Sequence, residues 1–164
     1  MARTPTTLAL LLGWLDEAYT GPAWHGPSLR AAIRGVDAAV AAWRPAPGRH
    51  NIWEIAVHAA FWKGAVRRRL TGHRERDFPR AGRNWFRCPE GGGRPDEGAW
   101  RRDAALVATE HRRLVRVVSG LDPASLGKPS AGHRQTPLEM VRGIAAHDVY
   151  HAGQIQLLKA LSRR

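Results

Sequence analysis

Two histidines stand four residues apart near the C-terminal end of the chain, within residues 147–151. Because residues four apart project from the same face of a helix, His147 and His151 can present their imidazoles to one site. A third histidine, His58, lies far upstream on the apolar side of another predicted helix. Neutral imidazole is the commonest protein ligand for divalent transition metals. The three histidines therefore predict a metal site that keeps open coordination positions, as catalytic metal sites do.

Three neutral imidazoles would leave the charge of a divalent metal uncompensated. Such a metal is a strong Lewis acid and lowers the pKa of a bound water or thiol. A thiol would be delivered as thiolate, its nucleophilic form. No carboxylate is required, and Asp148 is expected to point away from the shared face, as an acid behind the ligands or at the surface. Histidines on an apolar face are also often plain core residues, so the residues alone leave both interpretations open.

Three further side chains are candidates for a pocket beside the histidines. His25 lies in a Gly/Pro-bounded segment that can fold over the site, as a pocket residue or fourth ligand, although a surface position is the simpler interpretation. Trp62 follows His58 by one helical turn, and Gln154 continues the inward face after His151. Core packing and a buried amide with local bonds are the alternatives for these two. The remaining histidines are expected to be exposed: His50, His73, His111 and His133.

The chain is strongly basic, with 26 lysines and arginines against 14 acidic residues and a net charge of +12. Such charge attracts polyanions without specifying one. The arginines are spread along the chain, and the dense cluster at 67–69 is expected to form a solvated helix end that suits the helix dipole. No helix-turn-helix, zinc-finger or single-strand-binding pattern is present. Nucleic-acid association is therefore the weakest functional hypothesis.

The lone cysteine, Cys88, excludes an internal disulfide, which fits a reducing cytoplasm. It lies in a polar, Gly-rich stretch, where an exposed position is expected. The apolar run at 8–15 is too short for a membrane span, and Asp16 and Glu17 follow it. We interpret it as the start of a core helix rather than a signal peptide, and expect a cytoplasmic protein.

Apolar spacing and turn signals divide the chain into four long helical segments, expected from Pro5 to Tyr19, from Asn51 to Thr71, from Asp96 to Val118 and from Thr136 onward. Shorter helices are expected over 28–34 and from Asp37, and a long loop between the second and third long helices. Two long helices begin with capping-box patterns, Asn51 with Glu54 and Thr136 with Glu139. No segment alternates as a strand would. The sequence predicts an all-α protein with a four-helix bundle as its core.

The histidine pattern resembles the DinB/YfiT-like metalloprotein superfamily. The residues that carry the resemblance are His58 and the closing stretch 147–155, together with 23–29, 43–45 and 53–55. The resemblance implies a single DinB-like domain over 1–164 that holds one divalent ion, zinc, nickel, manganese or iron, on His58, His147 and His151. Members of this family often form dimers, so the resemblance also implies a homodimer.

Some members of this family are transferases or isomerases that use mycothiol, bacillithiol or glutathione. The resemblance thus favours a metal-dependent and thiol-dependent transferase, or a related hydrolase, whose partners are a low-molecular-weight thiol and an electrophile. The alternative is a non-catalytic metal-binding protein of the stress response. Neither a membrane nor a nucleic acid is an expected partner.

Overall fold

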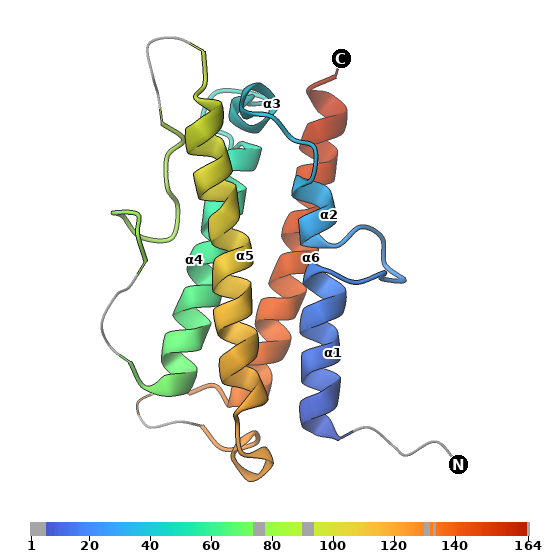
Figure 1. Ribbon diagram of the computed structural model, residues 1–164, viewed down its shortest axis with the longest axis vertical. Helices are drawn as coiled ribbons and strands as arrows, with labels where there is room; N and C mark the ends of the chain where they lie inside the picture. The colour runs from blue at the N-terminus through green and yellow to red at the C-terminus, as the bar shows by residue number, and fades with distance from the viewer. Residues whose placement is uncertain (1–5, 74–77, 90–93, 130–131, 133, 164) are drawn as a thin grey trace.

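The computed structural model describes residues 6–73, 78–89, 94–129, 132 and 134–163. Four long helices run side by side along the molecule (Figure 1): α1 (Thr7–Tyr19), α4 (Ile52–Thr71), α5 (Glu97–Ser119) and α6 (Pro137–Leu161). The shorter elements are α2 (Leu29–Ile33), α3 (Ala38–Ala42) and the 3-10 helix η1 (Pro123–Ser125). No strand occurs in the described residues. The predicted all-α bundle, with its short connecting helices, is confirmed.

The capping signals explain where the long helices begin and end. Thr136 and Glu139 form the predicted capping box at the start of α6, each satisfying a backbone N–H of the other residue. The Asn51 side chain accepts from the Glu54 backbone at 2.9 Å, but the Glu54 carboxylate faces other partners, so only half of that predicted box exists. Gly72 ends α4 with φ of 71°, a left-handed conformation that glycine adopts without strain.

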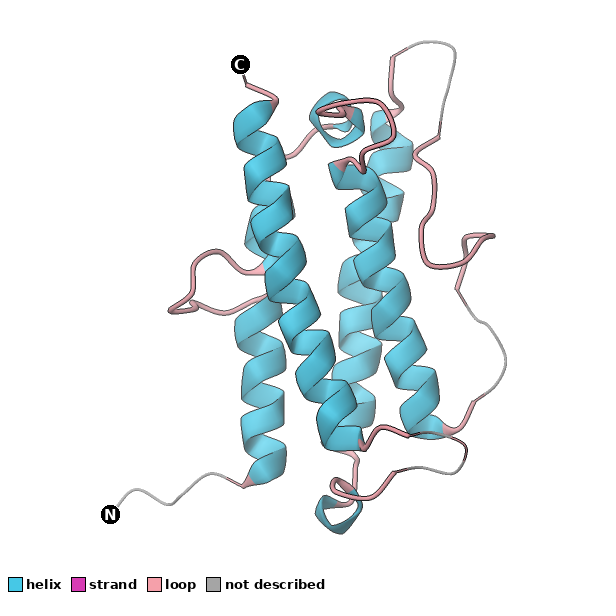
Figure 2. Ribbon diagram, turned by 180° about the vertical axis from the view of Figure 1, so that it is seen from behind, coloured by secondary structure: helices cyan, strands magenta, loops and turns pink. Residues whose placement is uncertain are grey.

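The core holds α4 at its centre, where every residue from Ile52 to Ala60 is buried. One apolar cluster, around Trp53 and Trp100, lies at the end of the bundle covered by α2 and α3. The other, around Leu15 and Leu114, joins the opposite halves of α1, α5 and α6. Seen from behind, α6 runs diagonally in front with α4 beside it (Figure 2). This pairing places His58 opposite the two histidines of α6.

The segment 78–89 between α4 and α5 packs onto the bundle through apolar side chains. Phe78 and Phe86 are buried and contact Phe61 of α4 through their rings. Cys88 is also buried, which corrects the expected exposed cysteine, and burial raises the pKa of its thiol. Among the described helices none is both long and apolar enough to cross a bilayer.

Candidate metal centre

The structure brings the three predicted histidines together on facing helices. His58 projects from α4, and His147 and His151 project from successive turns of α6. The Nε2 atom of His147 lies 3.1 Å from Nε2 of His58 and 3.0 Å from Nε2 of His151. One nitrogen from each ring lies within 4.8 Å of the other two. His58 and His151 are buried and His147 is half-buried, so the nitrogens meet at the edge of the bundle.

Two neighbouring oxygens fix the tautomers of the flanking rings. Nδ1 of His58 lies 2.8 Å from the backbone carbonyl oxygen of Asn84, which can only accept, so this nitrogen donates. Nδ1 of His151 donates in the same way to Oε1 of Gln154 at 2.7 Å. Each Nε2 is then left with a lone pair directed toward His147. Oxygens that hold the outer ring nitrogen in this way are a regular feature of histidine metal sites.

The geometry of the three nitrogens fits a transition-metal ion. Imidazole binds zinc at about 2.0–2.1 Å, so two ligands at angles between square and tetrahedral lie roughly 2.9–3.4 Å apart. The two Nε2 separations from His147, 3.0 and 3.1 Å, fall in this range, and the ligand nitrogens of His58 and His151 lie within 4.8 Å of each other. Nδ1 of His147 is buried and has no hydrogen-bond partner among the described residues. With the His147 proton on this Nδ1, all three Nε2 atoms carry lone pairs, and a cation at their meeting point would satisfy them, so the cluster could hold a metal ion.

Burial keeps the three imidazoles neutral. It lowers the pKa of His147 to about 3 and that of His151 to about 4, and neighbouring histidines add to the effect. Burial also lowers the pKa of His58, against the hydrogen bond to Asn84. Neutral imidazole is the form that coordinates a metal. The bundle therefore offers three metal ligands at neutral pH without a proton to displace.

A stack of flat rings connects His58 to the surface. The Trp85 ring stacks on His58 with centroids 3.9 Å apart and on His50 with centroids 3.6 Å apart. His50 and Arg44 both contact the buried carboxylate of Glu54. Burial raises the pKa of Glu54, but these hydrogen bonds outweigh it and lower the pKa to about 2. The ionised Glu54 thus holds the His50 ring in place, and the His50 ring in turn stacks on Trp85.

A pocket of about 420 Å³ opens on the far side of Trp85 from the histidine triad. Its walls include Trp85, His50, Glu54, Arg44 and Arg87. We call it the loop pocket, because Trp85 and Arg87 come from the long loop after α4. Arg44 is paired with Glu54, so Arg87 beside the Trp85 ring is the cationic side chain of this pocket that suits a ligand carboxylate.

The side chain of Asp148 is neither an acid behind the histidine ligands nor a surface acid. It is fully buried in an ion pair with Lys63 of α4, which has no exposed surface either. Lys63 Nζ lies 3.4 Å from Nδ1 of His111 and 5.1 Å from the ring centre of Tyr19. His111, expected to be exposed, is therefore buried, and burial lowers its pKa to about 3. These four residues form a polar cluster inside the bundle core.

The three pocket candidates have different positions. Trp62 lies beside the triad, with its ring centre 6.4 Å from that of His147, and donates from Nε1 to Oδ1 of Asn84 at 2.8 Å. Gln154 contacts His151 directly. His25 is exposed and lines a separate depression with Trp14 of α1, so the structure does not bring it to the triad.

Of the other histidines, His50 and His73 are exposed as predicted, whereas His133 lies outside the described residues. The arginine cluster at 67–69 is half-buried rather than fully solvated, and Arg67 lies 3.5 Å from the buried carboxylate of Glu110. Sequence reasoning missed Asn84 and Trp85, which hold His58. The signal that identifies them is a Trp-Phe pair, Trp85 and Phe86, inside an otherwise polar loop.

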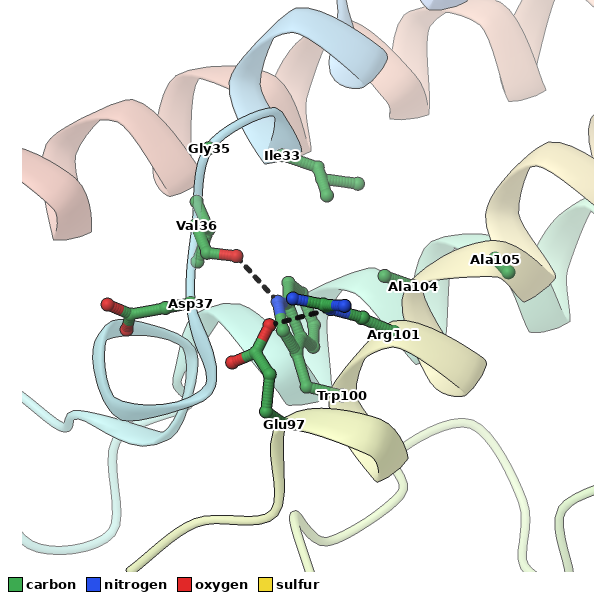
Figure 3. A pocket seen from close by; sticks show the side chains of 9 residues that line it. All are labelled: Ile33, Gly35, Val36, Asp37, Glu97, Trp100, Arg101, Ala104 and Ala105. Atoms are coloured by element: carbon green, nitrogen blue, oxygen red, sulfur yellow. Dashed lines mark hydrogen bonds and ion pairs between the residues drawn. The ribbon is translucent and has the colours of Figure 1, made fainter.

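A depression of about 520 Å³ lies where the connection between α2 and α3 meets the start of α5 (Figure 3). Its polar groups pair with one another. Trp100 Nε1 donates to the Val36 carbonyl at 2.7 Å, and Arg101 pairs with Glu97 at 3.1 Å. None of its lining residues belongs to the triad. We interpret it as a packing feature of this end of the bundle, separate from the histidine cluster.

Comparison with known proteins identifies the family of the chain. The family model described as the DinB superfamily matches residues 23–155, a span that contains all three histidines. No curated protein and no solved structure gives a significant match. The family match extends over most of the chain, from the residues before α2 to the last third of α6. The chain belongs to the DinB superfamily.

Proposed function

We propose that this chain binds one divalent metal ion on His58, His147 and His151 and transfers a low-molecular-weight thiol to an electrophile. The observation that carries the proposal is the convergence of three Nε2 atoms from neutral, oriented imidazoles. Zinc, nickel, manganese and ferrous iron all accept imidazole, and cellular supply helps to choose among them. When bound, such an ion supplies Lewis acidity, which lowers the pKa of a thiol or water beside it.

The protein's own residues prepare the site for this reaction. Asn84 and Gln154 hold two ligand rings in the tautomer that keeps Nε2 free. Trp85 covers the flat face of His58 and limits the approach of water from that side. In the transfer, the thiol loses its proton to solvent and its sulfur bonds to the electrophilic carbon. The displaced electron pair leaves with the halide of an alkyl halide; with an epoxide or an unsaturated ketone it moves to the opened oxygen or to the enolate, which then takes a proton from solvent.

The loop pocket is the favoured position for the polar part of the thiol. Its cationic groups lie next to Trp85, which stacks directly on a ligand of the proposed metal. Arg44 is already paired with Glu54, whereas Arg87 is exposed and lines the pocket. A carboxylate of mycothiol, bacillithiol or glutathione would take the Arg87 guanidinium as a two-pronged donor.

The proposal is tested by thiol consumption with metal-loaded protein. Each of the three thiols is incubated with an alkyl halide, an epoxide and an unsaturated ketone, and loss of thiol is followed against the metal-free protein and the His58/His147/His151 triple alanine variant. We expect metal-dependent turnover with at least one pair, abolished in the triple variant. Arg87→Gln should raise KM for the thiol about tenfold, whereas the exposed Arg116→Gln on α5 should not.

The triad alone, without a thiol site, would suit the alternative function, a non-catalytic metal-binding protein of the stress response. Stoichiometric metal without thiol consumption for any pair would favour that alternative and contradict the transferase. The two functions share the same histidines, so only turnover separates them.

A further inference from the structure

A groove runs from the histidine triad along the seam between α4 and α6. Its walls include Trp62 and Val66 from α4, and Met140 and Gly143 from α6. His147 closes one end, so the groove reaches the ligand cluster directly, and Arg69 also lines it. The groove does not share a wall with the loop pocket. Unlike the loop pocket, which Trp85 separates from the triad, the groove is lined by a histidine of the triad itself.

We propose that this groove binds the electrophilic substrate, and that this substrate is a small apolar or aromatic molecule with an anionic end. The inference rests on the proposed function, because it places the second reactant of the same transfer. The apolar body lies between Trp62 and Met140, and its reactive carbon faces His147. The anionic end pairs with Arg69.

The size and the lining of the groove indicate that the main part of the substrate is apolar. The groove has a volume of about 130 Å³. Cavities of about 150 Å³ lined by apolar side chains bind benzene, so one ring or a short hydrocarbon chain fits here. The edge of the Trp62 indole already faces the imidazole rings, with centroids 6.3 Å from His58 and 6.4 Å from His147. An aromatic ring of the substrate, bound in the groove, would pack against this cluster of Trp62 and the imidazoles.

The positive charge of Arg69 indicates that one end of the substrate is anionic. The Arg69 guanidinium lies over the Trp62 ring, 5.6 Å from its centre, and no carboxylate in the described part of the chain pairs with it. Glu139 also lines the groove, but its Oε2 accepts from the Thr136 backbone at 2.8 Å and from the Thr136 hydroxyl at 3.0 Å. This acid is held by the cap of α6, so among the residues lining the groove Arg69 is the cationic donor for a ligand and Gln135 is a neutral one.

Gly143 gives a direct way to fill the groove. A Cβ built on this helical glycine meets no atom outside the backbone of its own helix within 4 Å, so there is room for a larger side chain at a position that lines the groove. Gly13 of α1 has the same open surroundings and lines neither the groove nor the loop pocket. Both substitutions remove a helix-interior glycine and should favour the helix. Gly143→Leu and Gly13→Leu are therefore a matched pair.

The experiment measures binding of hydrocinnamate and its neutral amide by titration calorimetry, on the metal-free and the zinc-loaded full chain. We expect hydrocinnamate to bind both forms. Arg69→Gln should weaken binding roughly ten- to hundredfold, the range of a lost charged hydrogen bond. Gly143→Leu should weaken it by at least about tenfold, because its side chain competes with the ligand for the groove. Gly13→Leu and Arg116→Gln should bind as the wild type does. The amide should bind more weakly than the acid to wild type and equally to Arg69→Gln.

Three results would overturn the inference: no binding to the wild type, unchanged binding by Gly143→Leu, or binding that requires zinc, since the carboxylate would then be a metal ligand. Circular dichroism of each variant confirms that the helices remain. Binding to the metal-free chain reports the groove alone, whereas thiol consumption reports the proposed reaction. Failure of one is therefore distinguishable from failure of the other.

Discussion

The backbone carbonyl of Asn84 accepts a hydrogen bond from Nδ1 of His58 at 2.8 Å, across 26 residues of sequence. Asn84 has a φ of 62°, the left-handed conformation that asparagine tolerates better than most residues. Its side-chain oxygen accepts from Trp62 at the same time. The loop after α4 therefore orients a proposed metal ligand through one residue with an unusual backbone.

This contact predicts how metal affinity responds at position 84. Asn84→Gly keeps the carbonyl and the positive φ, whereas Asn84→Val strains the backbone there and displaces the carbonyl. Loss of such an oxygen behind a histidine ligand typically weakens metal binding about 10–100-fold. A competition titration with a chromophoric zinc chelator should therefore show affinity loss of about tenfold or more for the valine variant. Equal affinities for the two variants would disprove the role of this carbonyl.

The buried ion pair of Lys63 and Asp148 predicts an asymmetric effect of substitution. Removing one partner leaves an uncompensated charge in the core, which costs about 3–5 kcal/mol. Lys63→Met should lower the free energy of unfolding by that amount in urea titrations. The double variant Lys63→Met/Asp148→Leu should recover much of the loss, because apolar replacements of a buried pair are often neutral. A single variant whose free energy of unfolding lies within about 1 kcal/mol of the wild-type value would show that the pair is not fully buried.

The stability of the metal-free protein should fall in acid, in part because of His111. Its pKa is lowered from 6.5 to about 3 in the folded state by burial, and by Lys63 and Arg112. Between these values the unfolded chain binds the proton and the folded chain does not. The His111 contribution is thus fully present above pH 6.5 and is lost as pH falls toward 3.

His111→Phe tests this directly, because phenylalanine keeps a ring beside Tyr19, whose centroid is 4.0 Å from that of His111. Urea titrations from pH 7 to 5 should show a stability that falls less steeply for the variant, by up to about 1.4 kcal/mol per pH unit. His58, His147 and His151 titrate in the same direction in both proteins and cancel in the difference. Parallel pH profiles would show that His111 takes up its proton in the folded state.

The long helices could be predicted because their apolar spacing, caps and terminal glycine are local signals. The convergence of His58 with His147 and His151 also follows from the sequence once a bundle is assumed. Asn84 and Trp85 could not be placed, because a loop conformation has no periodic pattern. His111 and Asp148 were misplaced for a different reason. From the sequence, a lysine such as their partner Lys63 is expected at the surface. Only the packing of α4 against α5 and α6 shows that all three side chains are buried in the core.

The most direct test of the metal centre is metal content by mass spectrometry of tag-free protein, beside the His58/His147/His151 triple alanine variant. Each sample is measured as purified and after reconstitution with zinc, nickel, manganese and ferrous iron. We predict about one divalent ion per chain in the wild type and none held by the variant. A wild-type chain that stays empty with every metal, or a variant that retains the ion, would contradict the assignment of these three histidines as ligands.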